Sequence, residues 1–109
     1  MPITLPPPLD RYVAAQNAHD TDCLVACFAA DARVRDEGRD IVGADAIRAW
    51  KDETSARYRV TLEPLRIEPE AGGPALTARV SGTFPGSPVD LTFHFTLAGG
   101  LIQALEVTL

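Results

Sequence analysis

The sequence predicts an α+β fold in which three helices from the N-terminal half pack on one face of a curved antiparallel sheet. Apolar residues recur at helical spacing through the first half of the chain. From Tyr58 onward this spacing changes to alternation, as expected of strands with one buried face. Turns rich in glycine and proline divide this second half into hairpins. Helices that precede a run of antiparallel hairpins are typical of an α+β domain.

Length and charge narrow the class of protein. The chain has 109 residues, which we interpret as a single domain with one core, residues 1–8 forming an extended proline-rich arm. The net charge of −5 argues against nucleic acid as a partner, because phosphate binding needs clustered Lys and Arg. The sequence has neither a run of roughly 18 apolar residues for a membrane span nor the pattern of a secretory signal. We therefore expect a cytoplasmic protein with no membrane partner.

The first two helices are predicted on either side of a polar turn. Prolines at positions 6–8 are tolerated in a first helical turn, so the first helix follows them and presents Tyr12 on its apolar face. Asp20 ends the turn and is a suitable N-cap for the second helix. The buried face of that second helix is expected to hold Cys23, Leu24, Cys27 and Phe28.

A short strand and a third helix follow. The strand ends at Asp36, and residues 38–43 are expected to form a loop. The third helix covers residues 44 to 56, with Ile47 and Trp50 facing inward. An acid at the point where a strand leaves the sheet is well placed to face a pocket.

Alternation predicts four strands after the third helix. The first of them is bent at Pro64, where the apolar residues change parity and where Pro is usual at a bulge. Turns at residues 70–74, 84–88 and 98–100 separate the others. The clearest strand spans residues 89–97, and its odd-numbered residues are all apolar. A long sheet bent by bulges curls around its helices and can leave a cone-shaped cavity, which is a usual ligand site.

The reactive side chains do not group into a metal site or a nucleophile site. Cys23 and Cys27 are too few for a disulfide framework, and we interpret them as small core residues. No cluster of His and carboxylates has ligand spacing, and neither histidine has the Ser or Cys partner that nucleophilic catalysis needs. We therefore expect no metal and no cofactor.

Three stretches of the sequence carry a family resemblance. Residues 11–38, residues 43–50 and residues 93–107 together resemble the nuclear transport factor 2-like superfamily, and within it the SnoaL-like and ketosteroid-isomerase-like branch. The resemblance implies a cystatin-like cone with a cavity between helices and sheet. It does not imply one activity, because this fold hosts isomerases, cyclases, dehydratases, hydrolases and ligand-free scaffolding subunits.

The resemblance also implies two catalytic residues. Asp36 stands where the isomerases place their general base, and Tyr12 stands where they place an oxyanion-hole tyrosine. Phe93 stands where those enzymes have a protonated acid as a second donor. Because loss of one such donor costs about 10²–10³ in turnover, steroid isomerisation should be weak, whereas simpler proton transfer stays open. Without the resemblance, Asp36 reads as a solvated acid at a strand end and Tyr12 as a core tyrosine.

Further residues are expected to line the cavity. Four are aromatic and one is an amide that interrupts the apolar pattern of the last strand: Trp50, Phe84, Phe93, Phe95 and Gln103. Gln103 could instead mark an irregular strand. His94 alternates with Phe93 and Phe95, so it should lie on the opposite, outer face of the sheet.

Three functions remain open from the sequence. The first is an isomerase or cyclase in which Asp36 transfers a proton on a small apolar carbonyl compound. The second is a non-catalytic binder of a small hydrophobic molecule. The third is a structural or interaction domain whose cavity is filled by its own side chains. Because family members commonly pair through the outer face of the sheet, we also expect a homodimer through that face.

Overall fold

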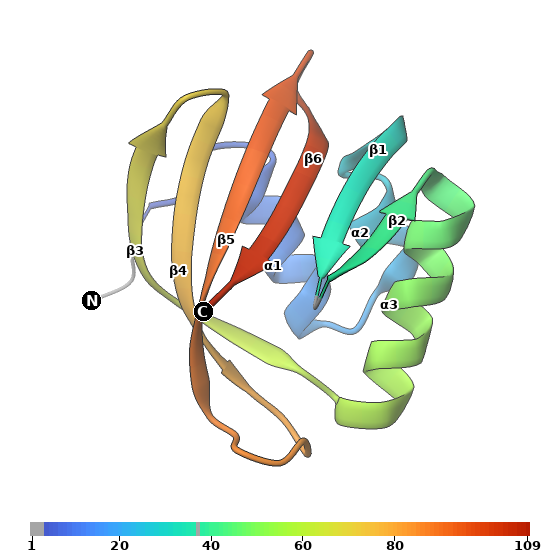
Figure 1. Cartoon of the computed structure of the whole chain (residues 1–109), viewed down its shortest axis with the longest axis vertical. Coiled ribbons are helices and arrows are strands. Elements are labelled where there is room, and N and C mark those ends of the chain that lie inside the picture. The colour runs from blue at the N-terminus through green and yellow to red at the C-terminus, as the bar shows by residue number, and fades with distance from the viewer. Residues whose placement is uncertain (1–3, 37) are drawn as a thin grey trace.

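The computed structural model describes residues 4–36 and 38–109. Within them it has three helices and six strands. In chain order they are α1 (Leu9–Asn17), α2 (Thr21–Val25), β1 (Phe28–Asp36), β2 (Arg39–Val42), α3 (Ala44–Tyr58), β3 (Thr61–Glu70), β4 (Gly73–Ser81), β5 (Val89–Ala98) and β6 (Leu101–Thr108). The strands form one sheet in the order β2-β1-β6-β5-β4-β3, with α1 behind it and α3 beside β1 and β2 (Figure 1). Among the described helices, none is both long enough and apolar enough to cross a membrane.

The predicted α+β fold is confirmed, but the sheet is mixed rather than wholly antiparallel. β1 pairs in parallel with β6, with Val34 opposite Leu105, whereas the other neighbours pair antiparallel. The parallel pair arises because α3 and four further strands separate β1 from β6 in the chain. A connection that long can bring the last strand back in either direction.

The expected loop at residues 38–43 contains a strand. β2 pairs antiparallel with the end of β1, so that Asp36 lies opposite Arg39. Only Ile41 of its four residues is buried, which leaves no alternation to detect in the sequence. This hairpin holds the end of β1 beside α3.

Two helix boundaries differ from the prediction. Asp20 caps α2 as expected, because its side chain accepts a hydrogen bond of 3.1 Å from the backbone N–H of Cys23. However, Cys23 lies on the exposed side of α2, and the helix ends at Val25, so Phe28 begins β1 as a buried residue. In addition, α3 runs to Tyr58, the residue where alternation was expected to begin.

The bend in the sheet is where the sequence placed it. The pairing of β3 with β4 shifts register between Pro64 and Arg66, which confirms the predicted bulge. A second shift lies between Thr96 and Leu97 in the pairing of β5 with β6. Bulges increase local twist, so the sheet curves over the helices and both bury a common core. Fully buried members of that core include Leu9, Leu24, Val34, Ile47, Leu76 and Ile102.

Asn17 ties α1 to the start of β3. Its side-chain amide donates to the carbonyl of Leu62 at 2.9 Å, and its side-chain oxygen accepts from the Leu62 N–H at 2.7 Å. The side chain therefore satisfies both backbone groups of Leu62 as a neighbouring strand would. This pair of bonds positions α1 and β3 on two sides of the cavity described below.

Candidate functional site

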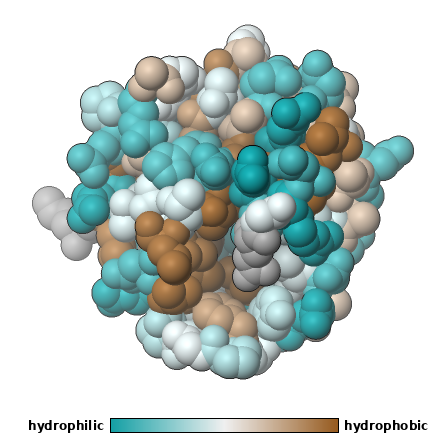
Figure 2. Space-filling model, viewed as in Figure 1, coloured by the Kyte–Doolittle hydropathy of each residue, from teal (hydrophilic) through white to brown (hydrophobic). Residues whose placement is uncertain are grey.

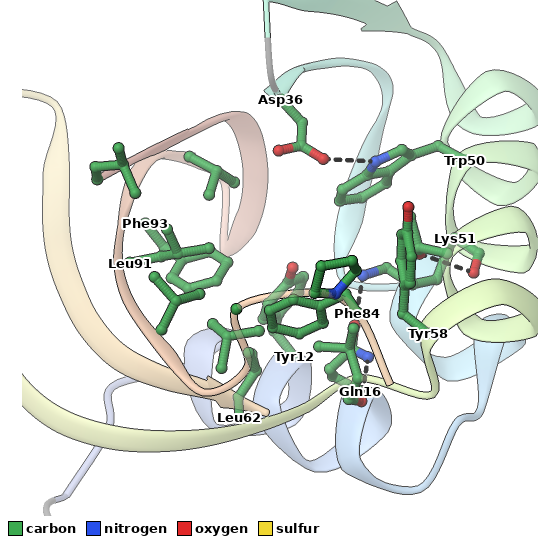
Figure 3. A pocket seen from close by; sticks show the side chains of 18 residues that line it. Tyr12, Gln16, Asp36, Trp50, Lys51, Tyr58, Leu62, Phe84, Leu91 and Phe93 are labelled. Atoms are coloured by element: carbon green, nitrogen blue, oxygen red, sulfur yellow. Dashed lines mark hydrogen bonds between the residues drawn. The ribbon is translucent and has the colours of Figure 1, made fainter. Parts of the chain in front are cut away.

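A cavity of about 550 Å³ lies between α1, α3 and the inner face of the sheet (Figure 3). Its apolar walls include Trp50, Leu62, Phe84, Leu91, Phe93 and Val107. A smaller group of polar side chains shares the same space: Tyr12, Gln16, Asp36, Lys51, Thr54 and Tyr58. The structure thus brings five of the sequence-predicted residues to one cavity, namely Tyr12, Asp36, Trp50, Phe84 and Phe93.

Asp36 ends β1 at the edge of this cavity and is half-buried. Its Oδ2 accepts a hydrogen bond of 3.1 Å from Nε1 of Trp50 on α3. The other carboxylate oxygen is directed away from the indole in Figure 3 and has no hydrogen-bond partner among residues 4–36 and 38–109. The indole therefore fixes the orientation of the carboxylate while leaving one oxygen for a ligand.

Tyr12 comes from α1 and is only 1% exposed. Its ring packs edge-to-face against Phe28 and Phe95, with centroid distances of 6.0 and 5.5 Å. Its hydroxyl points into the cavity (Figure 3) and makes no hydrogen bond within the part of the chain that the structure describes. Burial, with added repulsion from the negative charge of Asp36, raises the pKa of Tyr12, so the hydroxyl stays a donor at neutral pH.

Lys51 is the charged residue among the polar cavity residues that the sequence did not predict; the others are Gln16, Thr54 and Tyr58. It follows Trp50 on α3, and only 7% of its surface is exposed. Its Nζ donates to Oε1 of Gln16 and lies 4.3 Å from the centre of the Trp50 ring. Gln16 is held in turn by a 2.9 Å hydrogen bond from its amide to the carbonyl of Val60. Burial lowers the pKa of Lys51 to about 8, against the smaller opposing effect of the Asp36 charge.

A signal for Lys51 was present in the sequence. It is the only lysine of the chain, and it lies four residues after Ile47 on the inward-facing side of α3. A helix brings residues at this spacing to the same face. A single charged residue on a predicted apolar face is therefore a candidate for a cavity, although charged helix residues are more often solvated.

The structure places Phe95 and Gln103 away from the cavity. Phe95 is buried behind Tyr12 and supports that ring instead of lining the cavity. Gln103 occupies the extra position in β6, because Ile102 pairs with Leu97 and Ala104 with Thr96. It thus marks an irregular strand, and its amide donates to Asp31 at 3.2 Å.

The inward position of Phe93 leaves no acid where the resemblance would require one. Phe93 is 5% exposed and forms part of the apolar wall. Among the described residues, no group of three His, Cys, Asp or Glu side chains could hold a metal ion. The titratable groups of the site are one carboxylate, two phenols and one amine, set among mostly apolar walls.

Fold and cavity together define a class: an α+β domain whose curved sheet and helices line a pocket of a size that suits a small molecule. The model of the SnoaL-like domain matches residues 9–105. The chain therefore belongs to the SnoaL-like family, and its fold is like that of a nuclear transport factor 2-like protein from Cytophaga hutchinsonii. No curated protein matches the sequence.

Solved structures agree with this assignment. A candidate polyketide cyclase from Sinorhizobium meliloti is 39% identical, with 95% of each chain covered and a TM-score of 0.91. A protein of ketosteroid isomerase-like fold from Catenulispora acidiphila, in complex with trimethylamine, is 21% identical over 97% of this chain and 87% of that one, with a TM-score of 0.85. A Mycobacterium tuberculosis protein in complex with estradiol-17β-hemisuccinate is 21% identical over 91% and 88%, with a TM-score of 0.78. The last two show likeness of fold.

Proposed function

We propose that the cavity binds a small apolar carbonyl compound and that Asp36 transfers a proton on it, as in an isomerase or a polyketide cyclase. One observation carries the proposal: an oriented carboxylate and a phenol that has no partner in the described chain open onto the same apolar space. A volume of about 550 Å³ falls within the usual range for small-molecule sites. The likeness to a candidate polyketide cyclase at 39% identity supports the same class of substrate.

The chemistry follows from the two polar groups. The carboxylate of Asp36 accepts a proton from the carbon next to the carbonyl, and the electron pair moves to the carbonyl oxygen. Tyr12 donates a hydrogen bond to that oxygen as its negative charge develops. Asp36 then returns the proton to another carbon, which completes an isomerisation. In a cyclisation, the enolate carbon instead attacks a second carbonyl of the same molecule, and the proton held by Asp36 passes to the alkoxide oxygen that forms there.

Exchange of hydrogen for deuterium tests the proton transfer without knowledge of the natural substrate. In heavy water, the protein should catalyse exchange at the methyl group of 2-acetonaphthone, measured by NMR. Asp36→Asn should abolish this exchange, a loss on the order of 10²–10⁴, because an amide cannot accept the proton. Tyr12→Phe should reduce exchange less, since the proton path remains. Exchange by Asp36→Asn at the rate of the native protein would contradict the proposal.

Steroid isomerisation is expected to be weak in the native protein. Phe93 cannot supply the second hydrogen bond to the oxyanion. Strong turnover of a standard ketosteroid would show that another group supplies it.

The same cavity also supports the second reading, a non-catalytic binder. The Mycobacterium tuberculosis protein of the same fold is in complex with a steroid derivative. Saturable binding of 2-acetonaphthone without any enhanced exchange would favour that reading. The third hypothesis, a structural domain whose own side chains fill the cavity, is hard to reconcile with a mostly apolar space of about 550 Å³. A cytoplasmic location and a homodimer through the outer sheet face remain part of the proposal.

A further inference from the structure

The position of Lys51 is unusual for its residue type. Lysine is almost never fully buried unless it is paired with an acid. Here the Nζ donates to the neutral amide of Gln16 and lies over the Trp50 ring, 5.9 Å from the centre of the Tyr12 ring. Since this is the only lysine of the sequence, the chain has placed its single ε-amine in the cavity.

These surroundings make the neutral amine far more abundant than it is in an ordinary lysine. Burial penalises the charged form, and this effect outweighs the opposing charge of the Asp36 carboxylate. With a pKa of about 8, about a quarter of the amine is neutral near pH 7.5, whereas an ordinary lysine is neutral in about one molecule in 1000. A neutral amine in an apolar site has a free electron pair and is a nucleophile toward carbonyl carbon.

We infer that Lys51 is a second reactive group of the cavity, and that its amine condenses reversibly with an aldehyde or ketone ligand to form an imine. The inference rests on the proposed function only in taking carbonyl compounds as the ligands. It does not use the proton transfer by Asp36. It therefore adds covalent capture to the activities that this cavity supports.

The step balances without an oxidant or a reductant. The nitrogen electron pair of Lys51 attacks the carbonyl carbon, and a proton moves from nitrogen to oxygen to give a carbinolamine. Loss of water, made of the former carbonyl oxygen and two protons, then leaves the carbon–nitrogen double bond. The Tyr12 hydroxyl opens onto the same cavity and is a donor for the departing oxygen.

Adduct formation should rise with pH as the ammonium form is lost. Titratable groups near Lys51 come from three elements and one turn. Tyr12, Asp36 and Tyr58 line the same cavity, and His19 and Asp20 lie with Lys51 around a smaller cleft behind it. Among these groups, the charge of Asp36 raises the pKa of Lys51 against the effect of burial. Asp36→Asn should therefore lower the pKa of Lys51 and form the adduct at least as fast as the native protein.

The test is reductive trapping with 2-naphthaldehyde and cyanoborohydride near neutral pH, read by mass spectrometry. Apart from the α-amine at the start of the chain, Lys51 is the only primary amine. Trypsin should leave an alkylated peptide that spans residues 49–57, because cleavage after the modified lysine is blocked. Occupancy of the cavity is measured separately through fluorescence of Trp50, the only tryptophan. We expect quenching together with the naphthylmethyl adduct on Lys51.

Arg48→Lys is the matched control. Arg48 lies one turn earlier on α3, pairs with Asp22 and has a half-exposed side chain. The variant therefore offers the aldehyde an exposed lysine on the same helix beside Lys51. The amount of adduct on Lys51 should be at least about ten times the amount on the introduced lysine, because a larger fraction of Lys51 is neutral. Lys51→Met, checked for folding by circular dichroism, should lose the internal adduct and leave only the slow reaction of the α-amine.

The outcomes separate this inference from the proposed function. Quenching of Trp50 without an adduct on Lys51 would overturn the inference and leave the deuterium-exchange test of Asp36 untouched. Equal labelling of Lys51 and the introduced lysine would also overturn it. The absence of both quenching and adduct would contradict the inference and also the choice of ligand. An adduct on Lys51 in Asp36→Asn, which should lose deuterium exchange, would support two separate activities.

Discussion

At the scale of single residues, burial of Lys51 lowers the free energy of unfolding by an amount that depends on pH. Its pKa is about 8 in the folded protein and about 10.5 in the unfolded chain, a difference worth roughly 3 kcal/mol. Below about pH 8 both states bind the proton, and the folded state bears the whole cost of the buried charge. Between pH 8 and 10.5 the unfolded state binds more protons, so the free energy of unfolding contributed by this group rises with pH.

Lys51→Met should make the protein more stable at neutral pH, by about 1–3 kcal/mol, because it removes a buried charge and keeps most of the side-chain volume. The rise in unfolding free energy between pH 8 and 10.5 should shrink in the variant. Urea unfolding of both proteins over this range measures the effect. The high pKa values of Tyr12 and Cys27 lower stability at alkaline pH in both proteins, so the difference between them isolates Lys51. A variant less stable at pH 7 would show that the bond to Gln16 outweighs burial.

Residue-scale prediction from the sequence was incomplete for a physical reason. Asp36 and Tyr12 were found through family resemblance, and Trp50 through helical spacing. Lys51 lies on the same helical face as Ile47, but a charged residue on a helix is usually solvated, so the pattern alone favoured the wrong environment. Gln103 could not be placed because a strand bulge moves a side chain from one face to the other.

At the scale of elements, the cavity depends on how α1 is joined to β3. Asn17→Ala removes both hydrogen bonds to the backbone of Leu62 and leaves the N–H and carbonyl of that residue without partners. Loss of partners for buried backbone groups costs about 1–3 kcal/mol. Thermal or urea unfolding should show a loss of that size, with weaker quenching of Trp50 by 2-naphthaldehyde because Leu62 lines the cavity.

Asn17→Asp is the matched control for this pair of bonds. It keeps the oxygen that accepts from the Leu62 N–H and loses the amide that donates to the Leu62 carbonyl. If the bond from the Asn17 amide to the Leu62 carbonyl contributes to stability, Asn17→Asp should lower the free energy of unfolding measurably. An alanine variant as stable as the native protein would show that water replaces Asn17 without cost.

The sequence predicted elements with a long, regular pattern better than short ones. The strand that became β5 alternates over its whole length, and the bulge at Pro64 was visible as a change of parity. β2 has four residues and one buried side chain, too few to show a period. The parallel pairing of β1 with β6 is a long-range contact, and local periodicity carries no information about its direction.

At the scale of the whole molecule, the outer face of the sheet is polar. Arg79 and Asp90 form a 3.1 Å ion pair there, and His94 contacts both Glu70 and Thr108. Figure 2, which shows the molecule from the same side as Figure 1, has hydrophilic residues over much of the strand region and an apolar patch near the C-terminus. Because these charges are already paired within one chain, this face can be solvated as it stands.

A homodimer through this face should therefore be sensitive to salt. In a two-fold dimer both chains use the same surface, so each charged residue of this face, Arg79 and Glu106 among them, enters the contact twice. Exposed ion pairs contribute little and are screened by salt, so the dimer should dissociate as salt rises from about 0.05 to 1 M. Sedimentation velocity at several protein concentrations measures this dissociation.

Arg79→Glu is the sharper perturbation, because it places like charges beside Asp90 in both copies and should weaken the dimer even at low salt. Thr96→Ala, an uncharged change on the same face, serves as its control and should dimerise as the native protein does. A monomer under every condition would exclude the dimer. A dimer that ignores both salt and Arg79→Glu would mean that the copies meet through an apolar surface, and the patch near the C-terminus is then the surface to mutate.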